Sequence, residues 1–246
     1  MTPYSIDINA DVGEGIDNED QLLPLVSSCN IACGGHAGDR ETMSKVVQIA
    51  KMHRVKIGAH PSYPDRENFG RSIVDMSCAA LFSSIKTQIK SLMSVLREQH
   101  CQLHHVKPHG ALYNQAAKDK ETAQVIIEAL KSIQLPLKLY VPYGSVIADE
   151  ARKQKIPITY EAFADRNYND DLSLVSRSNE NALITDAHEM FEHMKKMVLD
   201  QKVKTVSGAE VHIEAETFCI HGDHPKAVQL LKSLRKKLST ADIQAQ

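Results

Sequence analysis

Residues 104–114, HHVKPHGALYN, carry the pattern that decides the fold. An apolar, strand-like run, LHHVK (103–107), ends at Pro108 and Gly110, and three imidazoles, an ammonium, a phenol and an amide crowd that end. Pro and Gly commonly terminate regular structure. Polar chemistry gathered where a buried strand ends is typical of α/β proteins, whose ligands bind at the carboxyl ends of parallel strands.

Outward from this segment, strand-like runs alternate with amphipathic ones along the whole chain. The strand-like runs are YSIDIN (4–9), CNIAC (29–33), VKIGA (55–59), LHHVK (103–107), LKLYV (137–141), PITYEAF (157–163) and TFCIH (217–221). Helical spacing of apolar residues predicts helices at 40–53, 78–99, 119–133, 186–200 and 224–238. KTVSGAEVHI (204–213) predicts a hairpin, and the polar tail 239–246 is expected to fray. This order predicts an α/β protein with a mostly parallel sheet.

Composition excludes several classes of protein. The 246 residues include 42% apolar and 24% charged side chains, an ordinary globular balance that fits a single domain, 1–246. A net charge of −2 gives no footprint for nucleic acid, and no apolar run approaches the ~20 residues of a membrane span. Five cysteines, an odd number, and no secretory signal pattern at the N-terminus favour a reduced, cytoplasmic protein over a disulfide framework.

Polar side chains gather at the ends of six of the seven runs. In chain order they are Asn9, Asp11 and Glu14; His36 and Asp39; His60, Asp65, Arg66 and Arg71; Lys107, His109, Tyr113 and Asn114; Glu161, Asp165 and Arg166; and His221 and Asp223. An open doubly wound sheet gathers its site at one crevice, from two or three strand ends. Six polar ends favour a ring of strands, so we predict a distorted, TIM-like barrel of about seven strands with its site at one rim.

Some of these residues have a simpler interpretation. Asp39 and Asp223 sit where helix N-caps are expected, which would account for them without any site. His104 and His105 fall within a strand and are interpreted as structural. Cys29 and Cys33 have a metal-like spacing, but no second cysteine pair follows to complete a zinc site.

The ordered strings also carry a family resemblance. They are DINADVGEG, LVSSCNIACGGHAGDRETM, IGAHPSYPDRENFGR, VKPHGALYN, EAFADRNY and CIHGDHPKAV, and they run from residue 6 to about residue 228. Together they resemble the LamB/YcsF family. The resemblance implies a distorted β/α barrel related to polysaccharide deacetylases. It also implies ATP-dependent opening of 5-oxoproline to glutamate by a bacterial 5-oxoprolinase, in which this chain would be the A subunit and would act with subunits B and C.

The sequence departs from the family pattern in a few places. Gly35 stands where the family usually has Phe, and Asp171 where Gly is common. The stretch SNENALI (178–184) lacks the family's small residues. These differences would alter a loop that closes over the substrate.

Hydrolysis of a lactam through a phosphorylated intermediate needs a base, cations for oxyanions and an acid for the leaving nitrogen. Asp11, His60 and His109 are candidates to position or deprotonate water, and Glu161 or Asp165 to act as the acid. Lys107, Arg71 and Arg166 are candidates to hold phosphate or carboxylate. Further substrate contacts are predicted for Asn9, His36, Tyr113, Asn114, His221 and Asp223. Asp11, His60 and His109 also form a candidate divalent-metal set.

The nucleotide and the class of activity leave alternatives open. No G-x-x-x-x-G-K-[ST] string occurs, so we expect a partner to use the ATP and the isolated chain to turn over little substrate. A metal-dependent amidase or deacetylase that needs no ATP is one alternative. A non-catalytic subunit that binds a small acid is another, although such a site would use fewer acid–base groups.

Overall fold

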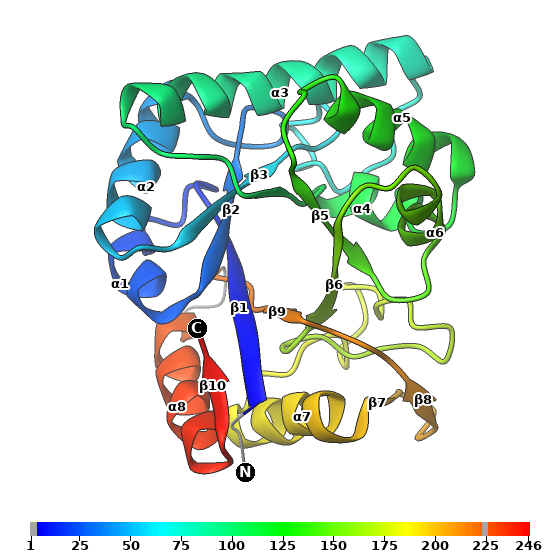
Figure 1. Cartoon of the computed structure of the whole chain (residues 1–246). Helices are drawn as coiled ribbons and strands as arrows, with labels where there is room; N and C mark the ends of the chain where they lie inside the picture. The colour runs from blue at the N-terminus through cyan, green and yellow to red at the C-terminus, as the bar shows by residue number, and fades with distance from the viewer. Residues whose placement is uncertain (1–3, 223–225) are drawn as a thin grey trace.

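The computed structural model describes residues 4–222 and 226–246. Within these residues, seven parallel strands close a barrel in the order β1-β2-β3-β4-β5-β6-β9 and back to β1 (Figure 1). Their bounds are β1 Tyr4–Val12, β2 Ser28–Ala32, β3 Lys56–His60, β4 His105–Val106, β5 Lys138–Pro142, β6 Ile158–Phe163 and β9 Thr217–Cys219. Because β9 pairs with both β6 and β1, the predicted barrel is confirmed over the open sheet.

Helices cover the outside of the barrel (Figure 1). Five lie at predicted positions: α2 Arg40–Met52, α3 Cys78–Glu98, α5 Lys120–Lys131, α7 Ala187–Asp200 and α8 Ala227–Thr240. The short elements α1 Glu19–Leu22, η1 Leu23–Leu25, α4 Gly110–Ala116 and α6 Val146–Lys153 were not predicted, since few turns leave little periodicity to detect. Asp39 accepts a hydrogen bond from the Thr42 amide as the N-cap of α2, so its simpler interpretation holds. Among the described residues, none of the helices combines the length and the hydropathy that a membrane span requires.

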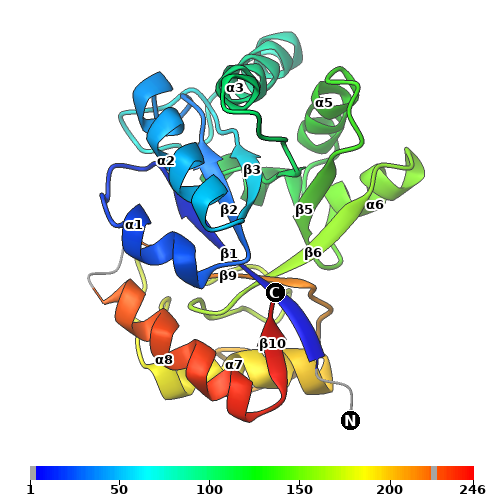
Figure 2. The ribbon, with the colours of Figure 1, turned by 60° about the vertical axis from the view of Figure 1, so that its left-hand side comes forward.

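The C-terminal part adds pairings at the margin of the barrel. Strands β7 Lys202–Lys204 and β8 Glu210–His212 pair in antiparallel fashion, which confirms the predicted hairpin. The tail does not fray as expected, because β10 Ile243–Ala245 pairs in parallel with Tyr4–Ile6 of β1. The side chain of Ile243 is buried there, and Figure 2 shows β10 beside β1 and α8. The buried side chain of Ile243 thus holds in place a segment that its polar composition predicted to fray.

Strand β1 is three residues longer than predicted, and the extension brings Asp11 into the strand, where it joins Asn9 inside the barrel. Side chains alternate between the two faces of a strand, so Asn9 and Asp11 share one face while Ile8 and Ala10 share the other. Asn9 donates to Glu161 of β6 at 2.9 Å, across the barrel interior, and Ile8 is fully buried in the apolar core. At this strand, the side chains that face the barrel interior are therefore polar, whereas those that face the helices are apolar.

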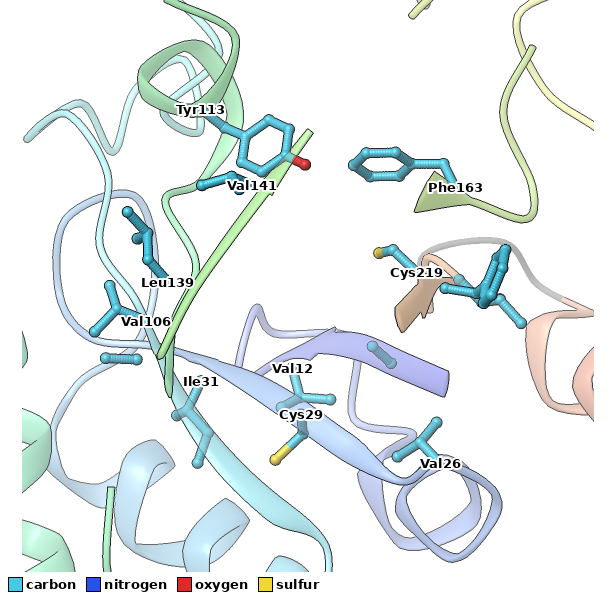
Figure 3. Close-up of a cluster of buried hydrophobic side chains, with 14 of the residues drawn as sticks. Val12, Val26, Cys29, Ile31, Val106, Tyr113, Leu139, Val141, Phe163 and Cys219 are labelled. Carbon is cyan, nitrogen blue, oxygen red and sulfur yellow. The ribbon is translucent and has the colours of Figure 1, made fainter. Parts of the chain in front are cut away.

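The apolar core includes side chains such as Cys29, Ile31 and Val106, and it extends to Tyr113 and Phe163, which line the cavity described below (Figure 3). Cys29 and Cys33 belong to it, and burial raises the pKa of both thiols, that of Cys33 to about 12. Both therefore remain protonated near neutral pH, as is usual for cysteines of an apolar core. His105 is buried inside the barrel, where Asn30 is 2.7 Å from its Nε2 and Tyr140 stacks on its ring, in agreement with a structural role.

Candidate active site

A cavity of about 690 Å³ opens at the carboxyl ends of the barrel strands. Ten of the predicted site residues line it: Asp11, His60, Arg71, Lys107, His109, Tyr113, Asn114, Glu161, Arg166 and His221. Asn9, His36 and Asp165 are not in the lining but contact residues that are, and Asp223 lies outside the described residues. The volume is in the range of small-molecule sites. Parallel strands explain the convergence, since all their carboxyl ends open on one face.

Lys107 forms the floor of the cavity between two carboxylates. Its Nζ lies 3.0 Å from Asp11 Oδ1 and 2.9 Å from Glu161 Oε1, and all three side chains are buried. Burial would lower the pKa of Lys107, but Asp11 above all, helped by Glu161, raises it well above its usual value. Burial would likewise raise the pKa of Asp11, yet His60 and Lys107 hold it well below the usual range. The floor is thus a fixed cation flanked by carboxylates.

Three histidines from different strand ends surround one carboxylate beside this floor. His60 Nε2 lies 2.9 Å from His109 Nδ1 and 3.3 Å from Asp11 Oδ2. The ring of His36 stacks on that of His109 with centroids 3.6 Å apart, and its Nε2 lies 2.8 Å from Glu14 Oε1. Burial lowers the pKa of His36 to about 4 and that of His109 further. The rings of His36 and His109 are therefore neutral near pH 7.

Glu14 is a cavity-lining residue that the candidate set from the sequence leaves out. It lies 3.5 Å from His109 Nδ1 and 3.9 Å from His60 Nε2 and lines the cavity. Burial, and then the Asp11 carboxylate, raise the pKa of Glu14 to about 7. The flanking glycines Gly13 and Gly15 have positive φ angles of 74° and 83°, which turn the chain back over the strand end. Two glycines around an acid, GEG (13–15), were the available signal.

Asp165 and His221 form a second pair of groups at the rim. Asp165 accepts a hydrogen bond from the His221 amide at 2.8 Å, and its two carboxylate oxygens lie 3.1 and 3.0 Å from His221 Nδ1. Burial would raise the pKa of Asp165, but His221 brings it below the usual value. The carboxylate therefore fixes the orientation of the imidazole, and an acid role for Asp165 near neutral pH is disfavoured.

Cations and apolar rings line the rest of the cavity. Arg71, Lys118, Arg166 and Arg177 are among the lining residues. The Arg166 guanidinium is held by the carbonyls of Val175 and Ala182, at 2.6 and 3.3 Å. The rings of Tyr113 and Phe163 meet edge to face, 5.9 Å apart, between α4 and β6 (Figure 3). The mouth thus offers positive charge for an anion and apolar surface for a small ring.

Two of the departures from the family pattern lie in different surroundings. Asp171 lines the cavity, where its carboxylate accepts from the Ser173 amide and hydroxyl. Gly35 does not line it: a Cβ built there would be 2.3 Å from Ser62 Oγ and 2.4 Å from Gln88 Oε1. The Gln88 amide, which bonds both backbone groups of Ser62, fills that space instead. Gly35 therefore affects the packing of α3 rather than the cavity directly.

Comparison with known proteins agrees with the family resemblance seen in the sequence. The LamB/YcsF family model matches residues 6–246. The 5-oxoprolinase A subunit of Haemophilus influenzae strain PittEE is 41% identical over 95% of both chains, and the protein of the same name from Shouchella clausii is 43% identical over 95% of this chain and 94% of its own. The crystal structure of a lactam utilization protein from Thermus thermophilus aligns with a TM-score of 0.91 and 38% identity, over 98% of this chain and 99% of that one. The chain belongs to the LamB/YcsF family.

Proposed function

We propose that this protein is the A subunit of a 5-oxoprolinase and opens the lactam ring of 5-oxoproline to give L-glutamate. The observation that carries the proposal is the cavity at the barrel mouth, which combines buried acid–base groups with a cationic rim in a chain 41% identical to proteins of that name. The substrate is a five-membered ring with one carboxylate. The apolar edge formed by Tyr113 and Phe163 suits the ring, and the arginines suit the carboxylate.

ATP supplies the driving force through partner subunits in this proposal. Phosphorylation of the lactam oxygen makes the ring carbon electrophilic. Water then forms a bond to that carbon, the carbon–nitrogen bond breaks and the nitrogen takes up a proton, which leaves the γ-glutamyl phosphate. A second water hydrolyses this acyl phosphate to glutamate and phosphate. Because the chain contains no Walker-type phosphate loop, we assign nucleotide binding to subunits B and C. The cations of the mouth, Arg71, Arg166 and Arg177, would receive the phosphorylated substrate.

The side chains at the floor and rim divide the remaining work. Lys107, fixed between Asp11 and Glu161, presents a positive charge where negative charge develops on oxygen, and such a preorganised charge is effective in a site that excludes water. The imidazole of His221 has its Nδ1 held by Asp165, which leaves Nε2 as the nitrogen that can exchange a proton with the substrate. A histidine oriented by a carboxylate is a common general acid–base arrangement.

The test is a reconstitution of the chain with its partners. Glutamate release from 5-oxoproline is measured with ATP, for the chain alone and together with subunits B and C. We expect turnover only with the partners. A His221→Asn variant should assemble normally but lose at least about 100-fold in kcat. His212→Asn, on an exposed hairpin strand, is the matched control and should retain full activity.

Three results would overturn the proposal. The first is an absence of glutamate release by the assembled subunits. The second is ATP-independent hydrolysis of N-acyl compounds by the chain alone, which would instead support an amidase. The third is unchanged turnover in the His221→Asn complex, which would support a binding subunit whose acid–base groups take no part in chemistry.

A further inference from the structure

The hydrogen bonds of His60 fix the position of its proton. Nδ1 lies 2.8 Å from the carbonyl oxygen of Lys107, and a carbonyl only accepts. In the neutral ring the proton is therefore on Nδ1, and Nε2 carries a lone pair. That lone pair points toward His109, whose Nδ1 is 2.9 Å away.

His109 also has one ring nitrogen held by a backbone carbonyl, but in this ring the nitrogen is Nε2 rather than Nδ1. Its Nε2 lies 3.0 Å from the carbonyl oxygen of Phe69, so the proton of the neutral ring is on Nε2 and the lone pair is on Nδ1. With both rings neutral, two nitrogen lone pairs face each other across 2.9 Å without a donor between them. The exposed fraction is 1% for His60 and 8% for His109, so both residues are largely buried. A shared proton or a metal ion at this point would remove the repulsion between the lone pairs.

Other ligand atoms converge on the same point. Glu14 Oε1 lies 3.5 Å from His109 Nδ1 and 3.9 Å from His60 Nε2. Ligand atoms of a tetrahedral zinc ion, at 2.0–2.1 Å from the metal, are about 3.3 Å apart, and the three separations of 2.9, 3.5 and 3.9 Å bracket that value. Carbonyl partners on the far side of both rings are the outer-shell bonds usual for metal-binding histidines. A lone proton would satisfy the two rings, but it would not account for the approach of a third ligand atom, Glu14 Oε1, to both nitrogens.

His36 and Asp11 are excluded from the ligand set by their own contacts. A metal binds an imidazole nitrogen in the plane of the ring, and the His36 ring is parallel to that of His109 at 3.6 Å, so one ion cannot lie in both planes. Its Nε2 instead donates to Glu14 and orients that carboxylate. Asp11 Oδ1 is already engaged by Lys107 and Asn30. Its Oδ2 lies 3.3 Å from His60 Nε2, but Asp11 is not among the residues whose ligand atoms gather within 4.8 Å of one another around Glu14.

We propose that Glu14, His60 and His109 bind one divalent transition-metal ion of the zinc type, at the floor of the cavity that all three residues line. This set differs from the Asp11, His60 and His109 set suggested by sequence, because Glu14 replaces Asp11. Two imidazoles and one carboxylate, with a side open to the cavity, are the donors typical of a catalytic rather than a structural zinc site. Such an ion would polarise a substrate oxygen or lower the pKa of a bound water. The assignment does not depend on the identity of the substrate.

Metal binding itself is the readout of the test, without any assay of turnover. Protein purified without chelator is analysed for metal by mass spectrometry. The metal-free protein is then titrated with Zn²⁺ by calorimetry and with Co²⁺ by visible absorption. We expect one equivalent per chain, with a dissociation constant below about 1 μM. Glu14→Gln and His109→Gln should weaken binding about 100-fold or more, since each removes a ligand.

Two variants serve as matched controls. Asp11→Asn tests the alternative ligand set, and His221→Asn tests the other cluster of potential ligands, Asp11, Cys219 and His221. Both should keep the Co²⁺ spectrum and bind within about tenfold of the wild type. Circular dichroism establishes whether each variant is folded. If a ligand variant does not fold, the titration of the wild-type protein still decides whether the metal binds. Loss of binding in Asp11→Asn but not in Glu14→Gln, or no wild-type binding tighter than about 10 μM, would overturn the assignment.

Discussion

The ion pairs of Lys107 give the sharpest test of how the site is held together. In a Lys107→Met variant the two carboxylates that it bridges, Asp11 and Glu161, lose a cation at 3.0 and 2.9 Å. The Lys107 side chain is 3% exposed and that of Glu161 is not exposed, so water cannot replace it. Removing one partner of a buried pair typically costs about 3–5 kcal/mol. A folded domain has only about 5–15 kcal/mol to lose.

A surface pair of similar length provides the control. Lys153 lies 2.7 Å from Glu150 on α6, but its side chain is 67% exposed. Lys153→Met should therefore change the free energy of unfolding by less than about 1 kcal/mol. The assay is urea denaturation followed by circular dichroism, with all variants at one pH. The double variant Lys107→Met, Glu161→Gln should recover part of the loss, because one of the uncompensated charges is gone.

The refuting result is defined by the comparison of the two lysines. If Lys107→Met loses no more stability than Lys153→Met, the buried pairs contribute no more than exposed ones. The reasoning on the cavity floor would then fail. If the double variant is much less stable than Lys107→Met alone, unpaired charge is not the cause of the loss.

Two further predictions concern the barrel interior. Gly58→Ala would place a Cβ 2.1 Å from His105 Nε2 and displace that ring from Asn30. Urea denaturation should therefore show a decrease of at least about 2 kcal/mol in the free energy of unfolding, and a decrease under about 0.5 kcal/mol would contradict this prediction. Burial, and then His104 and Lys107, hold the pKa of His105 well below its usual value near 6.5. Below about pH 6.5 this residue therefore binds a proton in the unfolded chain but not in the folded chain, and the free energy of unfolding falls as the pH falls. His105→Gln should reduce the difference between pH 7.5 and 5.5 by about 1 kcal/mol, and an unchanged difference would argue against it.

Much of the fold was predictable because its signals are local. Apolar runs of strand length alternate with helical spacing, as at 55–59 and 78–99, and caps such as Asp39 mark where helices begin. Once the strands are taken as parallel, His60, His109 and Glu161 must open on one face, whatever their separation in sequence. Ten of the predicted site residues could therefore be placed in the cavity lining from strand ends alone, whereas the loop 171–177, which also lines the cavity, could not.

Only the tertiary structure decided how the barrel closes and how the site is arranged within it. The pairing of β9 with β1 joins residues more than two hundred positions apart, and no local preference encodes such a register. The extension of β1 to Val12 made Asp11 an interior residue on the same face as Asn9, because side chains alternate between the two faces of a strand. The positive φ angles of Gly13 and Gly15 brought Glu14 among the histidines. Residue type and order specify which elements form, whereas the partners of each buried polar group depend on distances of a few ångströms that are set only when distant strands pack.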